Sequence, residues 1–390
     1  MRILTIIPGE SSLKYSLYNT DNELPVTMGE FERIGLEGSK YSILYNDENI
    51  VEEIDITDFD IAINMLLDKL VNLDFIHNYE DIKCVSHKIL HGREIYKNST
   101  IISKDVVEDL IGFIDLYKDI EINIKCIEAI WDKFDMVTQV GVFDTGFYMD
   151  IEKTNYLYPV PYDWYEKYSI RKYGFNGIRN RYITNKVSEL TGKNDIKLVS
   201  CLLGSDTCIS AIKNGKCVDT SMGFSTLDGA VMGTRSGVID PTIVTYIMGK
   251  EGKNALEVLD DLNTQSGLLG LSEYSSKLSE IIENPNEKTN IAKDKYIRRI
   301  IDYIASYYLL LDGIDIIVLS GNIGINNIDL RRELFSKLEI LGVKIDNDKI
   351  NHVDELIKIS SDDSKIQVYV IPFEEESIIL EDTLNLVRNG

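Results

Sequence analysis

The chain has 390 residues, of which 44% are hydrophobic and 27% are charged, and its formal net charge is -23. The length predicts two domains, and the composition predicts a globular protein rather than a disordered one. The acidic balance argues against nucleic acid and anionic membrane surfaces as partners, because both repel a protein of this charge.

The start of the chain and its cysteines predict a cytoplasmic protein. The sequence opens with MRILTII and reaches Pro8 at once, which is not the pattern of a signal peptide, and no apolar run has the length of a membrane span. The five cysteines are odd in number, lie mostly in strand-like apolar segments and have no CxxC spacing. They are typical of buried thiols in a reducing compartment, and no zinc site is expected.

Strand and helix patterns alternate along the first part of the chain. In chain order they predict a strand–turn–strand unit over Ile3–Asn19, a helix over Phe59–Leu73, a strand over Ile82–Ser86, a helix over Asp105–Phe134 and a strand over Thr138–Phe143. Ser103 is the expected N-cap of the second helix. The last strand runs directly into Asp144, and residues at the carboxyl ends of central strands commonly form sites in α/β sheets.

The second part of the chain begins with a similar strand–turn–strand unit. The elements predicted there are this unit over Lys197–Val218 with a hairpin turn at Asn214-Gly215, a polar loop over Asn284–Asn290, a helix over Asp294–Leu311, strands over Asp315–Ser320 and Gln367–Ile371, and a helix over Glu374–Val387. Two such units indicate a duplicated domain. The turn in each offers backbone N–H groups and hydroxyls in a concave arrangement that suits a phosphate.

Six short motifs are spread along the chain. The longest is DTSMGFSTLDGAVMGTRSGVIDP over Asp219–Pro241, with Arg235 near its centre; such a segment builds irregular backbone around an anion. The others are SHKILHG at Ser86–Gly92, FDTGFY at Phe143–Tyr148, YGF at Tyr173–Phe175, SGNIGINN at Ser320–Asn327 and IPFEEE at Ile371–Glu376.

In order and spacing these motifs resemble the acetate/butyrate kinase family. The resemblance implies an α/β, duplicated two-domain sugar kinase/actin-like fold with a central interdomain cleft. Residues 1–149 plus 373–390 would form the N-terminal domain and residues 150–372 the C-terminal one. It also implies a homodimer that transfers a phosphoryl group between ATP and a short-chain carboxylate with Mg²⁺, chemistry that needs positioning and charge stabilisation more than covalent help.

The resemblance also implies roles for individual residues. Catalytic roles fall to Asp144, Arg235, Asn176 and Lys88, and Glu375 joins Asp144 as a metal-linked carboxylate. The residues implied to contact phosphate or nucleotide are Ser11, Ser12, Lys14, Gly204, Ser205, Asp206, Gly321, Asn322 and Gly324. Those implied to line the carboxylate pocket are Leu90, Phe175 and Thr226.

Several positions depart from the family pattern. Lys88 replaces an arginine and loses its bidentate fork. Histidines of the pattern are replaced by Tyr148, Asn176 and Leu202, none of which is a cation. Asn322 replaces a glycine on the adenine side, where a side chain would narrow the pocket.

Both turns of the strand–turn–strand units now contain a carboxylate. Glu10 lies in the first turn and Asp206 in the second. At contact range, a like-charge pair costs about 4 kcal/mol at an effective dielectric constant of about 20. Loss of a cation that stabilises the transition state commonly costs a further ~2–4 kcal/mol.

The sequence therefore leaves three interpretations open. The first is a working carboxylate kinase with altered specificity or a low rate. The second is a catalytically inactive member of the family that acts as a scaffold or regulator. The third is a carboxylate kinase that uses pyrophosphate instead of ATP, because the adenine side is the most changed.

Overall fold

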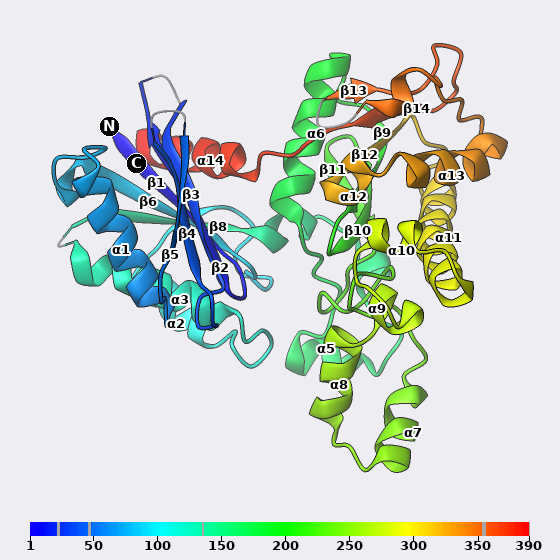
Figure 1. The fold of residues 1–390 in the computed structure, drawn as a ribbon, viewed down its shortest axis with the longest axis horizontal. Coiled ribbons are helices and arrows are strands. Elements are labelled where there is room, and N and C mark those ends of the chain that lie inside the picture. The colour runs from blue at the N-terminus through cyan, green and yellow to red at the C-terminus, as the bar shows by residue number, and fades with distance from the viewer. Residues whose placement is uncertain (22–23, 46–47, 135, 353–355, 390) are drawn as a thin grey trace. The chain divides into compact units, whose positions relative to one another are not determined.

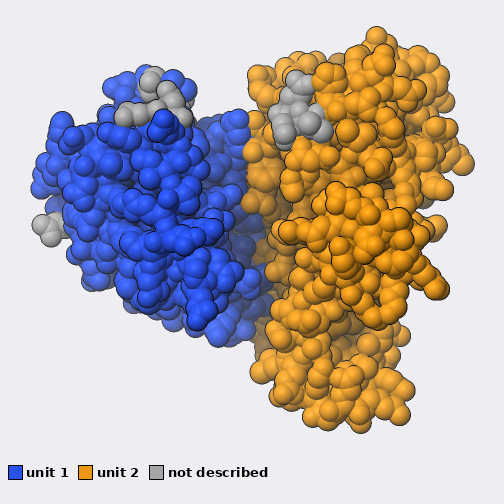
Figure 2. Space-filling model, in the orientation of Figure 1, with its two compact units in different colours: residues 1–146, 374–390 blue, residues 147–373 orange. Residues whose placement is uncertain are grey.

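The structure is a computed structural model that describes residues 1–21, 24–45, 48–134, 136–352 and 356–389. The chain divides into two compact units, which Figures 1 and 2 show. Unit 1 comprises residues 1–146 with 374–390, and unit 2 comprises residues 147–373. Within the described residues, no helix is long and apolar enough to cross a membrane.

Unit 1 is built on a mixed sheet with the strand order β5-β4-β3-β2-β1-β6-β8-β7. Its strands are β1 (Arg2–Pro8), β2 (Ser12–Asn19), β3 (Leu24–Glu32), β4 (Lys40–Tyr45), β5 (Glu48–Glu53), β6 (Ile82–Ile89), β7 (Thr100–Ile101) and β8 (Thr138–Phe143). Strands β1, β6 and β8 are parallel, and β1 to β5 form an antiparallel meander. The interior residues of β1 are buried without alternation, as expected for a strand covered on both faces.

The helices of unit 1 correct one sequence prediction. They are α1 (Phe59–Asn72), α2 (Lys104–Ile111), α3 (Ile120–Lys133) and α14 (Glu375–Asn389), with short 3₁₀ turns η1 (Tyr79–Asp81) and η2 (Asp144–Tyr148). The predicted N-cap is confirmed, because the Ser103 hydroxyl accepts the Val106 N–H. The single helix predicted over Asp105–Phe134 is wrong. It divides into α2 and α3 because the chain turns after Gly112, where the buried Phe113 packs into the core beside both helices.

Unit 2 repeats the plan of unit 1. Its strands are β9 (Lys197–Leu203), β10 (Thr207–Lys213), β11 (Lys216–Thr220), β12 (Ile316–Ser320), β13 (Ile357–Lys358) and β14 (Gln367–Val370). The order β11-β10-β9-β12-β14 matches β3-β2-β1-β6-β8 of unit 1, with the three central strands parallel in each sheet. The duplication predicted from the two strand–turn–strand units is thus visible in the topology.

Most helices of the chain belong to unit 2 (Figure 1). They are α4 (Lys153–Tyr156), α5 (Tyr162–Tyr168), α6 (Gly177–Thr191), α7 (Thr242–Glu251), α8 (Ala255–Thr264), α9 (Gly267–Ser272), α10 (Leu278–Glu283), α11 (Glu287–Leu310), α12 (Gly321–Asn326) and α13 (Ile328–Leu338), with 3₁₀ turns η3 (Glu339–Leu341) and η4 (Lys349–Asn351). Helix α11 begins at Glu287 rather than at Asp294, so the loop predicted over Asn284–Asn290 is partly helical. The reason is a capping box, in which Asn286 accepts backbone N–H groups and Thr289 accepts the Asn286 N–H.

Candidate functional site

Three charged residues gather at one edge of the unit 1 sheet. Lys88 lies near the carboxyl end of β6, and Asp144 directly follows β8. These strands are parallel neighbours in register, with Ile89 opposite Phe143, so their carboxyl ends meet at the same edge. Glu375 is the first residue of α14, which packs on β6 and β8. The fold therefore brings together residues that are far apart in the sequence.

The three residues are almost excluded from solvent. Lys88 Nζ lies 2.5 Å from Glu375 Oε2, and these side chains are 12% and 5% exposed. Asp144 is 2% exposed. Charges in such surroundings are normally paired or hold a metal ion. We call these three residues the unit 1 charge cluster.

The carboxylates of this cluster fit a magnesium ion better than a metal with an all-protein ligand shell. Within the described residues, no group of three or more His, Cys, Asp or Glu side chains could hold a metal. Magnesium is commonly bound by one or two carboxylates, with waters and substrate phosphates as its other ligands. Asp144 and Glu375 supply two such carboxylates at one sheet edge.

Burial shifts two titratable groups beside this cluster. His87 is fully buried, its Nε2 lies 2.5 Å from Gln139 Oε1, and burial lowers the pKa of its ring to about 4. Burial also raises the pKa of Glu376, the neighbour of Glu375. Burial disfavours the charged form of each group, which gives the two shifts their direction.

Asn123 is a residue at this edge that the sequence analysis missed. It lies in α3 and is 2% exposed. Its Nδ2 donates to Lys88 O at 2.8 Å, and its Oδ1 accepts the Leu90 N–H at 3.3 Å. It therefore fixes the backbone that carries Lys88 and Leu90. The sequence signal that could have identified Asn123 is a polar residue on the apolar side of a helix, since buried amides usually bond a specific partner.

The turn between β1 and β2 carries the first group of predicted phosphate ligands. The Gly9 N–H bonds to Ser12 O at 2.8 Å, which closes a tight turn over Ser11. Ser11 and Ser12 are half-buried, whereas Glu10 is exposed at the tip. Lys14 is also exposed, with its Nζ 4.0 Å from Glu30 Oε2. The carboxylate of this turn, Glu10, is thus in solvent contact within unit 1.

The turn between β9 and β10 carries the second group. The Gly204 N–H bonds to Asp206 O at 2.9 Å, and the Gly233 N–H bonds to Ser205 O at 3.2 Å. These bonds tie the turn to the MGTRSG segment. Each turn is thus closed by its own bond and braced by another segment: the Ile34 N–H bonds to Ser11 O at 2.8 Å in the first turn, and Gly233 braces the second.

The SGNIGINN motif lies directly against this second turn. Gly321 has φ +75, and a Cβ there would lie 2.5 Å from Leu203 O, so both the backbone conformation and the space favour glycine. Asn322 is exposed, and its Oδ1 accepts a hydrogen bond from Asn326 Nδ2 at 2.8 Å along α12. Gly324 is buried. The structure therefore places Gly321 against Leu203, directly before the Gly204–Asp206 turn.

Arg235 is held in a compact turn and is already paired with an acid. The Met232 N–H bonds to Arg235 O at 3.1 Å, and the Leu268 N–H bonds to Met232 O at 2.8 Å. Arg235 Nη1 donates to Asp206 Oδ1 at 2.5 Å. The side chains of this pair are 25% and 41% exposed. Asp206 thus contacts the arginine that the family resemblance assigns to an oxyanion.

A buried hydrogen-bond network holds the YGFN segment, Tyr173–Asn176. Tyr148 is fully buried, and its hydroxyl donates to Phe175 O at 2.5 Å. Asn180 Nδ2 donates to the Tyr148 hydroxyl at 2.7 Å, and Cys208 Sγ donates to the same Phe175 carbonyl. Tyr148, which stands where the family pattern has a histidine, therefore supports the loop that begins α6.

Asn176 suits the backbone at the start of α6. It has φ +63, a left-handed conformation that asparagine tolerates better than most residues. Its Oδ1 accepts from Arg179 Nη1 at 3.0 Å, and the residue is 8% exposed. Its neighbour Phe175 is buried, and Thr226 lies half-buried in the loop after β11. Of the three predicted carboxylate-pocket residues, these two belong to unit 2 and Leu90 to unit 1.

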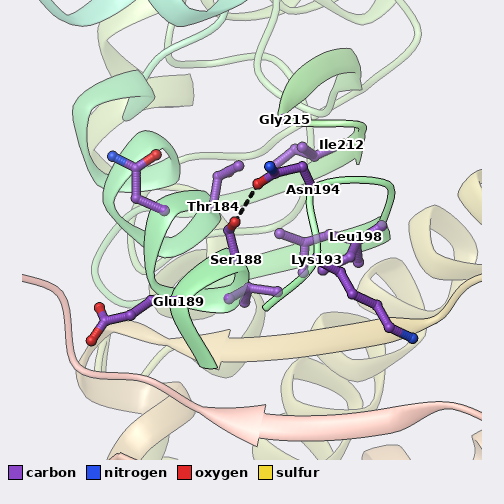
Figure 3. A pocket seen from close by; sticks show the side chains of 11 residues that line it. Thr184, Ser188, Glu189, Lys193, Asn194, Leu198, Ile212 and Gly215 are labelled. Carbon is purple, nitrogen blue, oxygen red and sulfur yellow. Dashed lines mark hydrogen bonds between the residues drawn. The ribbon is translucent and has the colours of Figure 1, made fainter. Parts of the chain in front are cut away.

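A hollow of about 400 Å³ lies elsewhere in unit 2. Figure 3 shows that it is lined by Thr184, Ser188 and Glu189 of α6, by Asn194, and by Leu198 and Ile212 of the sheet. Ser188 Oγ donates to Asn194 Oδ1 at 2.5 Å across it. The predicted site residues are not among those that line this hollow.

The duplicated strand order, with one hairpin turn per unit, is that of the sugar kinase/actin fold class. The model of the Acetokinase family matches residues 2–381. The acetate kinase of Carboxydothermus hydrogenoformans is 40% identical over 399 residues, covering 100% of both chains. The acetate kinase of Bacillus subtilis is 39% identical, covering 99% of this chain and 100% of that protein.

Solved structures give the same result. The acetate kinase of Porphyromonas gingivalis matches with a TM-score of 0.91 at 33% identity over 99% of both chains. A propionate kinase from Francisella tularensis matches with a TM-score of 0.91 at 30% identity over 98% of both chains. The chain belongs to the acetokinase family, and the resemblance found in its sequence motifs is confirmed.

Proposed function

We propose that the protein is a carboxylate kinase that transfers a phosphoryl group between ATP and acetate or another short-chain carboxylate, with low or altered activity. The observation that carries this proposal is the unit 1 charge cluster. A lysine and two carboxylates almost excluded from solvent at one sheet edge are costly to desolvate, and such groups are often found at functional sites. Family membership supports the reaction class.

Each residue has a role in the proposed reaction. Asp144 and Glu375 would hold Mg²⁺, which when bound neutralises charge on phosphate oxygens. Lys88 supplies a fixed positive charge to the transferred group, and Arg235 binds an oxyanion. The buried Phe175 contributes an apolar wall for the alkyl group of the carboxylate.

Changes in unit 2 support a lowered or altered rate. Asn176 engages Arg179 and is not a cation. Tyr148 takes a histidine position but is fully buried. Loss of a cation at a developing charge commonly costs ~2–4 kcal/mol, which is roughly a 30- to 1,000-fold loss of rate.

Two other functions remain candidates because specific observations favour them. The Arg235–Asp206 pair favours a non-catalytic scaffold, since the arginine is paired with a carboxylate of the chain itself. Asn322, exposed on α12 where the family pattern has glycine, favours pyrophosphate over ATP as the phosphoryl donor.

A hydroxamate-trapping assay distinguishes these functions. Acetate, propionate and butyrate are each incubated with the protein, Mg²⁺ and either ATP or pyrophosphate. Acyl phosphate formed with ATP and lost in Asp144→Asn supports the proposal, and acyl phosphate formed only with pyrophosphate supports the donor alternative. No product with either donor at high protein concentration would contradict both kinase functions.

A further inference from the structure

We propose that Asp206 is a specificity-determining residue: a built-in carboxylate that competes with an oxyanion ligand for Arg235. The inference rests on the proposed function only in the identity of the ligand, which is a carboxylate or a phosphoryl group. It begins from a contact between side chains that was not predicted from the sequence motifs or from the family resemblance. Arg235 Nη1 donates to Asp206 Oδ1 at 2.5 Å.

The geometry resembles an arginine with its anion already bound. A guanidinium has five N–H donors in a planar fork and pairs best with two oxygens of a carboxylate or phosphate. The contact with Asp206 uses one nitrogen and one oxygen. The pair is therefore monodentate, and a free oxyanion that engages the fork with two oxygens makes the better contact.

The backbone keeps Asp206 next to Arg235. The turn carrying Asp206 is closed by the Gly204 N–H and tied to Gly233, two residues before Arg235. Arg235 itself lies in the turn that Met232 closes. Because both residues are held on bonded turns, the carboxylate has a high effective concentration at the guanidinium, and a free ligand must displace it.

The exposure of the pair shows that displacement is feasible. The Arg235 and Asp206 side chains are 25% and 41% exposed. Ion pairs with this access to water are worth about 0.2–1 kcal/mol, far less than a buried pair. A ligand can therefore open the pair, but at a cost to its affinity for Arg235.

The test is calorimetric titration of the full chain with inorganic phosphate and, separately, with acetate. In the competition model, Asp206→Asn lowers the Kd by a factor of about 1.4 to 5 for whichever anion Arg235 holds. Asp206→Glu keeps a carboxylate and should retain a Kd close to that of the unaltered protein. The matched control is Asp261→Asn, which breaks the Lys253–Asp261 pair of similar exposure and should change neither Kd.

The outcomes divide cleanly. Tighter binding of either anion by Asp206→Asn supports the inference, and the anion that gains identifies the ligand class of Arg235. Unchanged or weaker binding of both, or no binding of either anion, overturns it. Thermal melts monitored by circular dichroism check that each variant is folded, and Asp206→Ser serves if the asparagine variant is not. Because this readout needs no turnover, it holds even if the hydroxamate assay finds no kinase activity.

Discussion

The two ion pairs of the candidate site differ in how far water reaches them. Lys88–Glu375 in unit 1 has side chains 12% and 5% exposed, whereas Arg235–Asp206 in unit 2 has side chains 25% and 41% exposed. Both contacts measure 2.5 Å, so distance alone does not distinguish them. The difference teaches that the first pair is shielded from water and stabilises its unit in addition to its proposed role in the site, while the second can be exchanged for a ligand.

The largest expected effect comes from breaking the buried pair. Lys88→Ala removes the ammonium group 2.5 Å from the buried Glu375 carboxylate, and we expect a loss of about 3–5 kcal/mol in the free energy of unfolding. Urea unfolding followed by circular dichroism measures it. The control is Lys40→Ala, which removes an exposed partner of Glu53 and should cost less than about 1 kcal/mol. Equal losses in the two variants would contradict the buried character of the Lys88–Glu375 pair.

The buried His87, next to Lys88 in the sequence, should make the stability of unit 1 depend on pH. The pKa of His87 falls from its ordinary 6.5 to about 4 because burial disfavours the charged ring. The folded state keeps the ring neutral, so between these values the unfolded state binds more protons. This contribution to stability is fully present above pH 6.5 and is lost as the pH falls towards 4, by about 3 kcal/mol in total.

Urea unfolding at a series of pH values between 7 and 4 measures this loss. His87→Gln removes the titrating ring and should flatten the profile. The exposed His77 provides the control, since His77→Gln should leave the profile as it is. If His87→Gln and the unaltered protein show the same pH dependence, His87 is not the group responsible.

A smaller effect is expected from the network below the YGFN segment. Tyr148→Phe removes the hydroxyl that donates to Phe175 O and accepts from Asn180 Nδ2. Loss of buried hydrogen bonds of this kind costs about 1–2 kcal/mol, to be measured as a fall in the free energy of unfolding. The control is Tyr246→Phe, at a tyrosine that is 63% exposed. Surface substitutions of this kind change the free energy of unfolding by less than about 0.5 kcal/mol. A neutral Tyr148→Phe would show that the network does not support the loop.

The smallest effect on stability is expected at the exposed pair. Asp206→Asn should change the free energy of unfolding by less than about 1 kcal/mol, even though it changes anion affinity. The same urea experiment checks it. A loss as large as that of Lys88→Ala would erase the distinction between the two pairs and give Asp206 a structural role.

Local patterns predicted much of the fold. The central strands were predicted because they are short apolar runs. Ser103 was predicted as an N-cap because the N–H group that its hydroxyl accepts lies only three residues away. The errors came where local and tertiary signals competed. The Asp105–Phe134 segment has continuous helical periodicity, yet the chain turns after Gly112 because Phe113 packs into the core.

The candidate site was less accessible to sequence reasoning. The motifs indicated four charged residues individually, Lys88, Asp206, Arg235 and Glu375. They did not predict that Lys88 pairs with Glu375 or that Arg235 pairs with Asp206. Lys88 and Glu375 are 287 positions apart, and no local periodicity encodes such a contact. Asn123 was missed for the same reason, since its partners lie on another element.

The late position of α14 has a consequence for biosynthesis. Glu375 follows Lys88 by 287 residues, although both complete unit 1. At about 5–20 residues per second, the ribosome needs roughly 15 to 60 s to make that stretch. Throughout this interval the nascent unit 1 sheet has neither the carboxylate for Lys88 nor the helix that covers β6 and β8. Unit 1 therefore stays incomplete while almost all of unit 2 is made, and β14 and α14 then complete the two units within a few residues of each other.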